Sequence, residues 1–208
     1  MTEHDKMFAG KIYDPFSEGM PEERANAHRL CKLYNDTFET ETEKRKAILD
    51  ELMPNRADDV YLQGPIYFDF GTNISMGEHS YANFNFTVLD EAKVNIGKSV
   101  FIGPNVSILT AIHPLCYQDR NSFLNKKTGM ITNLEYTGSV TIEDNCWIAA
   151  NVTICGPVTI GAGSVIAAGA VVTRDIPPNS LAMGVPCRVV RQITEADRLV
   201  AHPEMFAE

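Results

Sequence analysis

Histidine side chains are the groups in this chain best suited to move protons near neutral pH, because an imidazole has an ordinary pKa of about 6.5. The chain has five of them. His113 stands apart, since it follows Ile112 where a regular repeat gives way to a long polar segment. A partly exposed imidazole beside a loop could act as a general base. The other four are expected at the surface: His4, His28, His79 and His202.

Asn83 is a second candidate, in the run Tyr81-Ala82-Asn83-Phe84-Asn85. An asparagine at the corner of a repeat can hold the left-handed backbone conformation that most residues avoid. Its amide can also donate a hydrogen bond to negative charge that develops during a reaction. The residues alone leave a structural and a catalytic role for Asn83 open.

The elements that must position these side chains follow a six-residue period between Ile142 and Pro177. This period is neither the 3.6 of a helix nor a plain alternation. It is typical of a parallel β-helix, in which each hexad is a short strand and a turn, and three hexads close one coil. A Gly or Ala after the aliphatic residue is expected to let the chain bend. The aliphatic positions are Ile142, Ile148, Ile154, Ile160, Ile166 and Val172, and the small or β-branched ones are Cys146, Val152, Val158, Ser164, Ala170 and Ile176.

Residues 1–56 have another pattern and are expected to form an N-terminal helical cap. Pro21, followed by two acidic residues, is typical of a helix start, and an apolar stripe continues to Phe38. Thr40 and Glu43 have the spacing of a capping box that would open a second helix. Such a cap would cover the first coil, which otherwise presents unpaired strand edges.

The β-helix is expected over residues 57–190, which makes the fold mainly β. Residues 114–139 do not fit the six-residue period and are polar, so they should leave the coil as a loop excursion with its tip near Asn125 to Gly129. Residues 191–208 are expected to form a C-terminal tail with a short helix after Thr194.

Composition excludes several classes of protein. The net charge of −9 and the pI of about 5.0 argue against a nucleic-acid-binding surface. No apolar run is long enough for a membrane span, and the N-terminus lacks the pattern of a signal peptide. The five cysteines form no CxxC motif and are expected to be reduced thiols of a cytoplasmic protein.

Several short motifs, in this order along the chain, resemble the maltose/galactoside O-acetyltransferase family of the hexapeptide-repeat acyltransferase superfamily. Each motif alone is weak, but together they are specific and cover nearly the whole chain. They are Met7-Phe8-Ala9-Gly10-Lys11-Ile12-Tyr13-Asp14, Tyr81-Ala82-Asn83-Phe84-Asn85, Ile102-Gly103-Pro104-Asn105-Val106, His113-Pro114, Asn145-Cys146-Trp147-Ile148, Val171-Val172-Thr173-Arg174-Asp175-Ile176-Pro177-Pro178-Asn179 and Gly184-Val185-Pro186-Cys187-Arg188-Val189.

The resemblance implies an enzyme that moves an acetyl group from acetyl-CoA, as co-substrate, to a sugar hydroxyl without a metal. It implies a left-handed β-helix, against the usual right-handed preference of crossover connections. It also implies a homotrimer, which is a closed ring with an active site between neighbouring copies.

The resemblance also implies a role for each matching residue. His113 matches the general base, which takes the proton of the sugar hydroxyl as that oxygen attacks the thioester. Asn83 matches the residue that stabilises the oxyanion and also contacts the acceptor, and Glu135 resembles a loop acid that orients the imidazole. Acidic acceptor contacts are implied at Asp14, Asp69 and Glu91. Cofactor contacts are implied at Ala150, Ala168, Thr173, Arg174, Arg188 and Arg191.

Other readings remain open on the sequence. The segment between His113 and Trp147 is longer than the family pattern, so the acceptor could also be an antibiotic hydroxyl, serine or a nucleotide sugar. The same coil could carry a zinc hydratase of the γ-carbonic-anhydrase type, although only His79 and His113 lie in the repeats and three histidines are needed. A non-catalytic scaffold is the third alternative.

Overall fold

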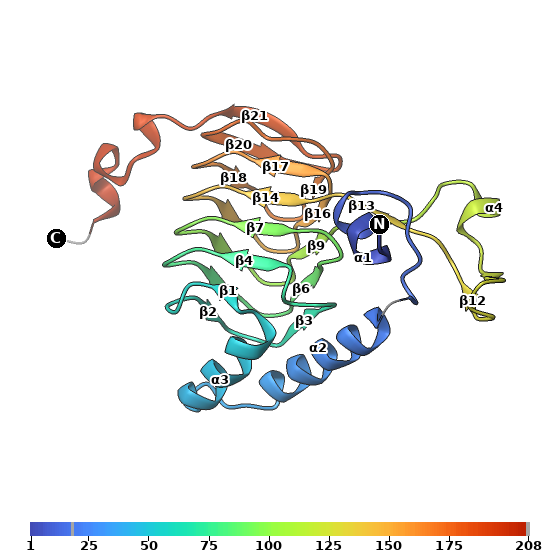
Figure 1. The fold of residues 1–208 in the computed structure, drawn as a ribbon. Helices are drawn as coiled ribbons and strands as arrows, with labels where there is room; N and C mark the ends of the chain where they lie inside the picture. The colour runs from blue at the N-terminus through green and yellow to red at the C-terminus, as the bar shows by residue number, and fades with distance from the viewer. Residues whose placement is uncertain (18, 207–208) are drawn as a thin grey trace.

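The repeats stack into a left-handed parallel β-helix with three walls (Figure 1). The computed structural model describes residues 1–17 and 19–206. Helices α2 (Met20–Asn35) and α3 (Thr42–Leu52) lie under one end of the stack, the excursion leaves its side, and the tail leaves its other end. The chain is therefore mainly β, as the six-residue period predicts.

Three sheets form the walls, and successive strands of one coil belong to different sheets. The first wall contains β1 (Asn55–Arg56), β4 (Ile74–Met76), β7 (Val94–Ile96), β14 (Val140–Ile142) and β17 (Val158–Ile160). The second wall contains β2 (Tyr61–Leu62), β5 (Tyr81–Ala82), β8 (Phe101–Ile102), β15 (Trp147–Ile148), β18 (Val165–Ile166), β20 (Ser180–Met183) and β21 (Arg188–Gln192). The third wall contains β3 (Ile66–Phe68), β6 (Phe86–Leu89), β9 (Ser107–Leu109), β16 (Thr153–Cys155) and β19 (Val171–Val172).

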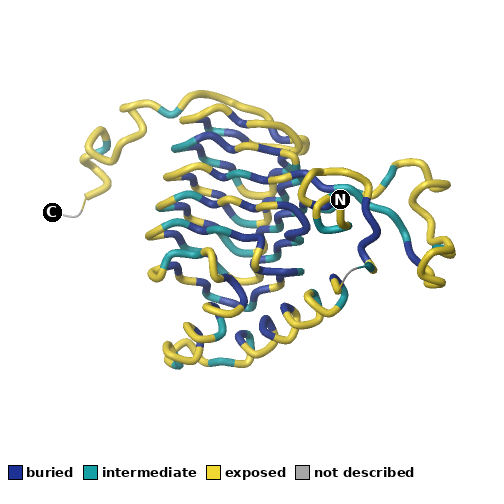
Figure 2. The backbone as a smooth tube through the Cα atoms, viewed as in Figure 1, coloured by how far each residue is buried: buried dark blue, intermediate teal, exposed yellow. Residues whose placement is uncertain are grey.

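Inward-facing side chains fill the space between the walls. Ile142 pairs with Ile160, and Ile148 pairs with Ile166, so each residue lies beside its equivalent three hexads later. The aliphatic and the small positions of the repeat are all buried, and Figure 2 shows buried residues recurring along every coil of the stack. The hexapeptide prediction is confirmed in its strands, its register and its core.

The left-handed backbone at the coil corners comes three residues after the inward aliphatic. Asn145, Asn151 and Gly163 have φ angles of 61°, 58° and 68°, which asparagine and glycine adopt at low cost. Some residues directly after the inward aliphatic are also small because the coils approach each other closely. A Cβ atom on Gly103 would lie 2.8 Å from the backbone of Ala149 in the next coil, so this position requires glycine.

The cap has one helix more than the sequence predicts. Helix α1 (Glu3–Phe8) precedes the expected pair, and α2 ends at Asn35, before Phe38. The predicted capping box at Thr40 is wrong, because α3 has Glu41 as its N-cap residue and no side-chain cap. The Glu41 carboxylate instead accepts a hydrogen bond from the backbone N–H of Phe38 at 2.7 Å, which closes the turn before the helix.

Arg45 of α3 fastens the cap to the first coil. Its side chain is buried, and its guanidinium donates to the hydroxyl of Tyr34 at 2.6 Å. It also donates to the carbonyl oxygens of Leu62 and Gln63 at 2.6 and 2.9 Å. These carbonyl groups lie at the end of β2, the first strand of the second wall, which has no strand on its outer side. The arginine donates the hydrogen bonds that such a strand would otherwise supply.

The excursion contains two antiparallel strand pairs, one at its base and one near its tip. At its base, β10 (Ala111–Ile112) pairs antiparallel with β13 (Tyr136–Thr137). Beyond α4 (Tyr117–Arg120), β11 (Phe123–Leu124) pairs antiparallel with β12 (Ile131–Thr132), and the tip lies at Asn125 to Gly129 as expected.

The stack ends at β21, which pairs antiparallel with β20. Three short 3₁₀ turns follow in the tail: η1 (Glu195–Asp197), η2 (Leu199–Ala201) and η3 (Pro203–Met205). Figure 1 shows the tail leaving the body of the stack. No helix in residues 1–17 and 19–206 has the length and apolar character needed to cross a membrane.

The Arg45→Ala variant should loosen the cap. It removes a charged donor from a hydroxyl and two carbonyl groups that are shielded from water, so we expect a loss of about 2–3 kcal/mol of stability and a lower melting temperature. Thermal unfolding followed by circular dichroism measures this loss. Lys44→Ala, which changes an exposed neighbour, is the control and should shift stability by less than about 0.5 kcal/mol. Equal melting curves for the two variants would contradict the role given to Arg45.

Candidate functional site

The candidate residues lie on two of the three edges at which the walls of the β-helix meet. The histidine edge lies between the third and first walls and holds Asp69, Glu91 and the exit of the excursion at His113. The alanine edge lies between the second and third walls and holds Asn83, Ala150 and Ala168.

His113 is fixed by the strand pair at the base of the excursion. Ile112 pairs with Tyr136, so His113 lies opposite Glu135, one step further along the two antiparallel strands. Glu135 also forms an antiparallel β-bridge with Tyr13, through two backbone hydrogen bonds of 3.0 and 3.3 Å. The Tyr13 hydroxyl donates to the Glu135 carboxylate at 3.4 Å. The exposed His113 thus has the half-buried Glu135 as its neighbour.

Burial raises the pKa of the Glu135 carboxyl group. The positive charges of His113 and Arg24 act in the opposite direction, as does the hydrogen bond from Tyr13. Burial also raises the pKa of the Tyr13 hydroxyl, which keeps that group a donor. A carboxylate that faces an imidazole can orient the ring and favour the imidazolium formed when the ring accepts a proton.

Asp69 and Glu91 form an acidic pair on adjacent coils of the same edge. Glu91 is only 6% exposed. Burial, then the hydrogen bond to Asp69 and the negative charge of Asp69, raise the pKa of Glu91 to about 9. The raised pKa favours the protonated form of Glu91, which can share a hydrogen bond with the Asp69 carboxyl group. Two carboxyl groups that share a proton offer both a donor and acceptors, which suits the binding of hydroxyl groups.

Asp14 is engaged by the excursion. It is 7% exposed, and its carboxylate accepts hydrogen bonds from the Phe16 N–H and the Asn125 amide, both at 3.0 Å, and from the Thr132 hydroxyl. Burial opposes ionisation, but these bonds hold the pKa of Asp14 below its ordinary value. Asp14 thus anchors the hairpin to the N-terminal segment, and a substrate could reach it only in exchange for one of these bonds.

Asn83 does not hold the left-handed conformation that the sequence allowed. Asn85 does, with a φ of 58°, and its amide begins a ladder with Asn105 and Asn151 across the coils, at 2.8 and 3.1 Å. Asn83 is half buried, and its side-chain oxygen accepts a hydrogen bond from the Phe84 N–H at 2.8 Å. That bond orients the amide, so its N–H₂ group remains a donor at the edge.

The alanine edge is a track of small residues that starts at Asn83. The strand register aligns Asn83 with Gly103 and then with Ala149 and its neighbour Ala150. Ala168 follows on the next coil, where its neighbour Gly169 bonds the oxygen of Ala150 at 2.9 Å. A slim chain could therefore lie along this edge without meeting a bulky side chain.

The remaining predicted cofactor residues lie near the C-terminal end of both edges. Arg188 belongs to β21 and pairs with Met183, beside the alanine edge. Thr173 and Arg174 are exposed on the histidine edge, after β19. Arg191 is held by Asp197 in two hydrogen bonds of 2.9 and 2.6 Å, so a phosphate would have to share its guanidinium with the tail.

Within one chain the two edges do not meet. The third wall separates them, and its strand β6 alone has four residues, which is roughly 10 Å or more. His113 and Asn83 of the same chain are therefore too far apart to contact the same reacting carbonyl group. The structure brings His113 together with Glu135, and Asp69 with Glu91, but it leaves Asn83 on the other side of the wall.

The two histidines of the repeat region also lie apart. His79 sits between the first and second walls and pairs with Asp59, whereas His113 lies between the third and first walls. In the described part of the chain, no group of three or more His, Cys, Asp or Glu residues could hold a metal ion. The described residues therefore offer no set of ligands for the zinc-hydratase alternative.

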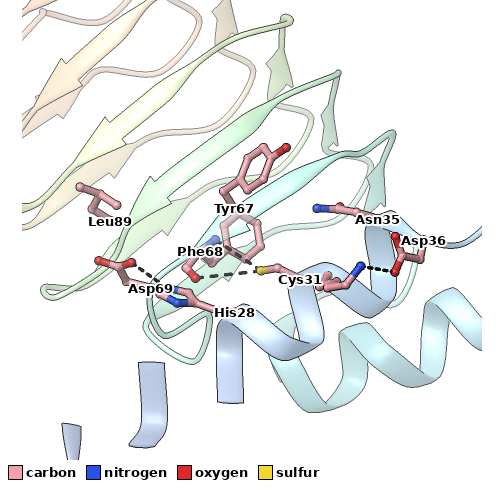
Figure 3. Close-up of a pocket in the computed structure, with 9 residues that line it drawn as sticks. His28, Cys31, Asn35, Asp36, Tyr67, Phe68, Asp69 and Leu89 are labelled. Atoms are coloured by element: carbon pink, nitrogen blue, oxygen red, sulfur yellow. Dashed lines mark hydrogen bonds and ion pairs between the residues drawn. The ribbon is translucent and has the colours of Figure 1, made fainter. Parts of the chain in front are cut away.

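Helix α2 supplies two residues near the site that the sequence analysis missed. The charge of Arg24 acts on Glu135. His28, expected at the surface, contacts Asp69, with its Nε2 atom 3.1 Å from Oδ1 (Figure 3). The two residues are four apart, so they lie on one face of the helix. The sequence signal that could have identified them is the four-residue spacing of Arg24 and His28 beside the apolar stripe of the helix.

Comparison with known families gives two matches. The description "maltose acetyltransferase hexapeptide capping motif" matches residues 6–55. The description "bacterial transferase hexapeptide (six repeats)" matches residues 139–174. The first match covers the helical cap and the second covers the regular coils after the excursion.

Individual proteins match over nearly the whole chain. The galactoside O-acetyltransferase of Escherichia coli K12 is 40% identical over 198 residues, which are 95% of this chain and 92% of that protein. The solved structure of a maltose O-acetyltransferase from Clostridium difficile 630 has a TM-score of 0.84 at 42% identity, covering 94% of this chain and 99% of that one. A galactoside acetyltransferase in complex with coenzyme A has a TM-score of 0.84 at 37% identity, covering 95% and 94%.

The protonated state of Glu91 should appear in the pH dependence of stability. Its pKa is about 9 in the folded chain against 4.5 ordinarily, so between these values unfolding releases a proton and stability falls as the pH rises. Glu91→Gln removes this proton. We expect the melting temperature of Glu91→Gln, minus that of the original chain, to increase as the pH is raised from about 6 to about 9.

Melting curves measured at several pH values test this expectation. Glu22→Gln changes an exposed acid on α2 and should follow the original chain at every pH. If Glu91→Gln also runs parallel to the original chain across the range, Glu91 is ionised in the folded protein and the acidic pair is wrongly described.

Proposed function

The chain belongs to the maltose/galactoside O-acetyltransferase family of hexapeptide-repeat enzymes, and on this premise we propose that it transfers an acetyl group from acetyl-CoA to a sugar hydroxyl, with His113 as the general base. The coenzyme A complex of one relative supports the donor. The galactoside and maltose enzymes support a sugar acceptor. Acetyl-CoA use also fits the cytoplasmic location expected from the sequence.

The pairing of His113 with Glu135 is the observation that supports the base most directly. The imidazole takes the proton of the sugar hydroxyl while that oxygen attacks the thioester carbonyl. The tetrahedral intermediate then expels the thiolate of coenzyme A, and the imidazolium returns the proton to the sulfur. Glu135 stabilises the imidazolium between the two steps, and no acetyl-enzyme is needed because both reactants are held together.

Asn83 of a neighbouring copy would stabilise the oxyanion. A closed ring of three chains, with the third wall of each facing the axis, brings the histidine edge of one chain beside the alanine edge of the next. The outward residues of that wall carry no charge, which favours a contact surface: Tyr67, Thr87, Ser107, Thr153 and Val171. The separation of His113 from Asn83 within one chain is then a property of a site shared by two chains.

Coenzyme A would lie along the alanine edge. From the C-terminal end toward the N-terminal end, this edge passes Arg188, then Ala168 and Ala150, then Asn83. A cofactor with its phosphates at the arginine and its pantetheine arm on the alanines would bring its thioester to Asn83. Thr173 and Arg174 of the neighbouring chain would reach the same groove from the histidine edge.

The acidic groups near His113 suit a sugar acceptor. Asp69 accepts hydrogen bonds, and the protonated Glu91 can donate or accept them. Both flank the histidine edge on the N-terminal side of the coil from which His113 leaves. A hydroxyl held at His113 would leave the rest of its ring beside these two acids.

Replacement of His113 by alanine should remove the general base. We expect the rate of acetyl transfer to glucose to fall about 10²–10⁴-fold while coenzyme A binding is kept, because the base does not contact the cofactor. Release of free thiol from acetyl-CoA measures the rate, and calorimetry measures binding. His79→Ala, which removes an exposed histidine of the same coil region, is the control. Full activity in His113→Ala would refute the assignment.

Mixed rings test whether the site is shared. Asn83→Ala and His113→Ala chains, each nearly inactive, are unfolded together and refolded. If neighbouring chains supply the two residues, about a quarter of the sites in random rings regain both, and the mixture becomes far more active than either variant. A mixture no more active than its parents would mean that one chain supplies both residues or that the copies do not form such a ring.

A further inference from the structure

Helix α2 reaches the histidine edge through the imidazole of His28. The Nε2 atom of this ring lies 3.1 Å from Oδ1 of Asp69, which directly follows β3, and both side chains line the hollow drawn in Figure 3. The Asp69 side chain is 20% exposed, and the His28 side chain is 59% exposed. The resemblance to known enzymes gives a role to Asp69 but none to His28, and the reaction described above does not use this imidazole.

His28 belongs to a row of α2 side chains that follows β3 along its length. The Asn35 amide donates to the Ile66 oxygen at 2.9 Å and accepts from the Ile66 N–H at 2.8 Å. The sulfur of Cys31 accepts from the Phe68 N–H at 3.4 Å. The three helix positions are three and four residues apart, so they share one face of α2. Because β3 is the terminal strand of its sheet, these side chains stand where a neighbouring strand would otherwise lie.

The last contact of the row is made to a side chain and not to the backbone. The N–H of Asp69 already donates to the Val88 oxygen of the next coil at 3.2 Å, so His28 is not needed to satisfy it. The imidazole bonds one carboxylate oxygen instead, and a ring nitrogen can donate this bond whether the ring is neutral or charged. The Oδ2 atom then remains for Glu91 or for a bound hydroxyl group. The contact therefore fixes the orientation of the Asp69 carboxylate.

Asp69 lies among other acids, and a basic partner holds it there. Burial, with a further contribution from the negative charge of Asp69, raises the pKa of Asp90, Glu91 and Glu135. His28 places a basic group against Asp69 from the helix side, which offsets part of this repulsion. Without the contact, the Asp69 carboxylate could turn away from the other acids toward water.

We propose that His28 is a positioning residue for the sugar acceptor: it holds Oδ1 of Asp69 so that Oδ2 and Glu91 face the hydroxyl groups of the bound sugar. The inference rests on the function proposed above, and it gives the cap a part in acceptor binding. Asp69 follows the first strand of the third wall, and His113 leaves the coil two levels further on, which is roughly 10 Å. His28 is therefore remote from the reacting atoms, and its loss should weaken acceptor binding more than the chemical step.

Steady-state kinetics of thiol release from acetyl-CoA test this role. The acceptor is whichever of glucose, maltose and methyl galactoside the unaltered chain acetylates fastest. His28→Ala removes a partly exposed hydrogen bond to a charged group, so it should raise KM for that sugar about three- to tenfold. We expect kcat and the KM for acetyl-CoA to stay within about twofold.

Two further variants complete the comparison. His28→Gln keeps a donor of similar reach and should recover most of the affinity for the sugar. Lys32→Ala, one turn further along α2 in an exposed pair with Asp36, is the control and should leave all three constants unchanged.

A double-mutant cycle separates positioning from direct contact with the sugar. If His28 acts through Asp69, His28→Ala should change KM for the sugar by less than about twofold in a chain that already carries Asp69→Ala. Independent, additive losses for the two substitutions would mean that His28 binds the sugar itself, and the proposal would be wrong.

Other results would also overturn the role of His28. One is an unchanged sugar KM in His28→Ala, and another is an equal rise in the KM for acetyl-CoA, which would show general damage to the site. A lower melting temperature or a smaller assembly in both His28→Ala and His28→Gln, seen by circular dichroism and sedimentation, would make His28 a structural residue. Failure of the unaltered chain to acetylate any of the three sugars is a separate result, because it refutes the proposed function and the role of His28 falls with it.

Discussion

The backbone hydrogen bonds between stacked coils are the constraint on which this structure depends. Because each coil repeats the one below at the spacing of neighbouring β-strands, equivalent side chains form straight lines along the edges. The asparagine ladder from Asn85 to Asn151 shows how strict this alignment is. The same alignment makes a smooth track of Gly103, Ala150 and Ala168. An extended ligand needs such a track, and the repeat produces it without a special loop.

The candidate proton-transfer residues lie where the six-residue repeat is interrupted. The corner after β6 has extra residues, and Asp90 and Glu91 are buried there. Burial raises the pKa of Asp90 to about 6, against the hydrogen bonds that it accepts from the N–H groups of Phe70 and Asn73. One coil later the excursion leaves the stack and carries His113 with it. The buried acids and His113 lie at these irregular corners, so the corners are the places where proton chemistry can be built.

The distribution of residues on the surface fits the site proposed to be shared by two chains. Its third wall, without charges on its outward positions, separates a base from an oxyanion donor that the proposed reaction needs at one carbonyl group. Acidic residues gather on one edge and small residues on the other, so each edge offers what the other lacks. The ring of three copies proposed above would resolve this separation with one contact repeated three times. In the single chain, Asp14 ties the N-terminal segment to the hairpin.

The sequence by itself determined the repeat, its core and its interruptions, because a six-residue period of Ile142, Ile148 and their successors fits only one stacking pattern. It also indicated His113 and the excursion, and a resemblance to known enzymes supplied the other candidate residues. Contacts between distant segments needed the tertiary structure. Asp14 meets Thr132, and His28 meets Asp69, only because the cap and the hairpin fold back on the coil. The capping box at Thr40 failed because the turn after α2 recruits Glu41 first. Which groups are buried together, and hence the proton on Glu91, is fixed by folding and by no local pattern.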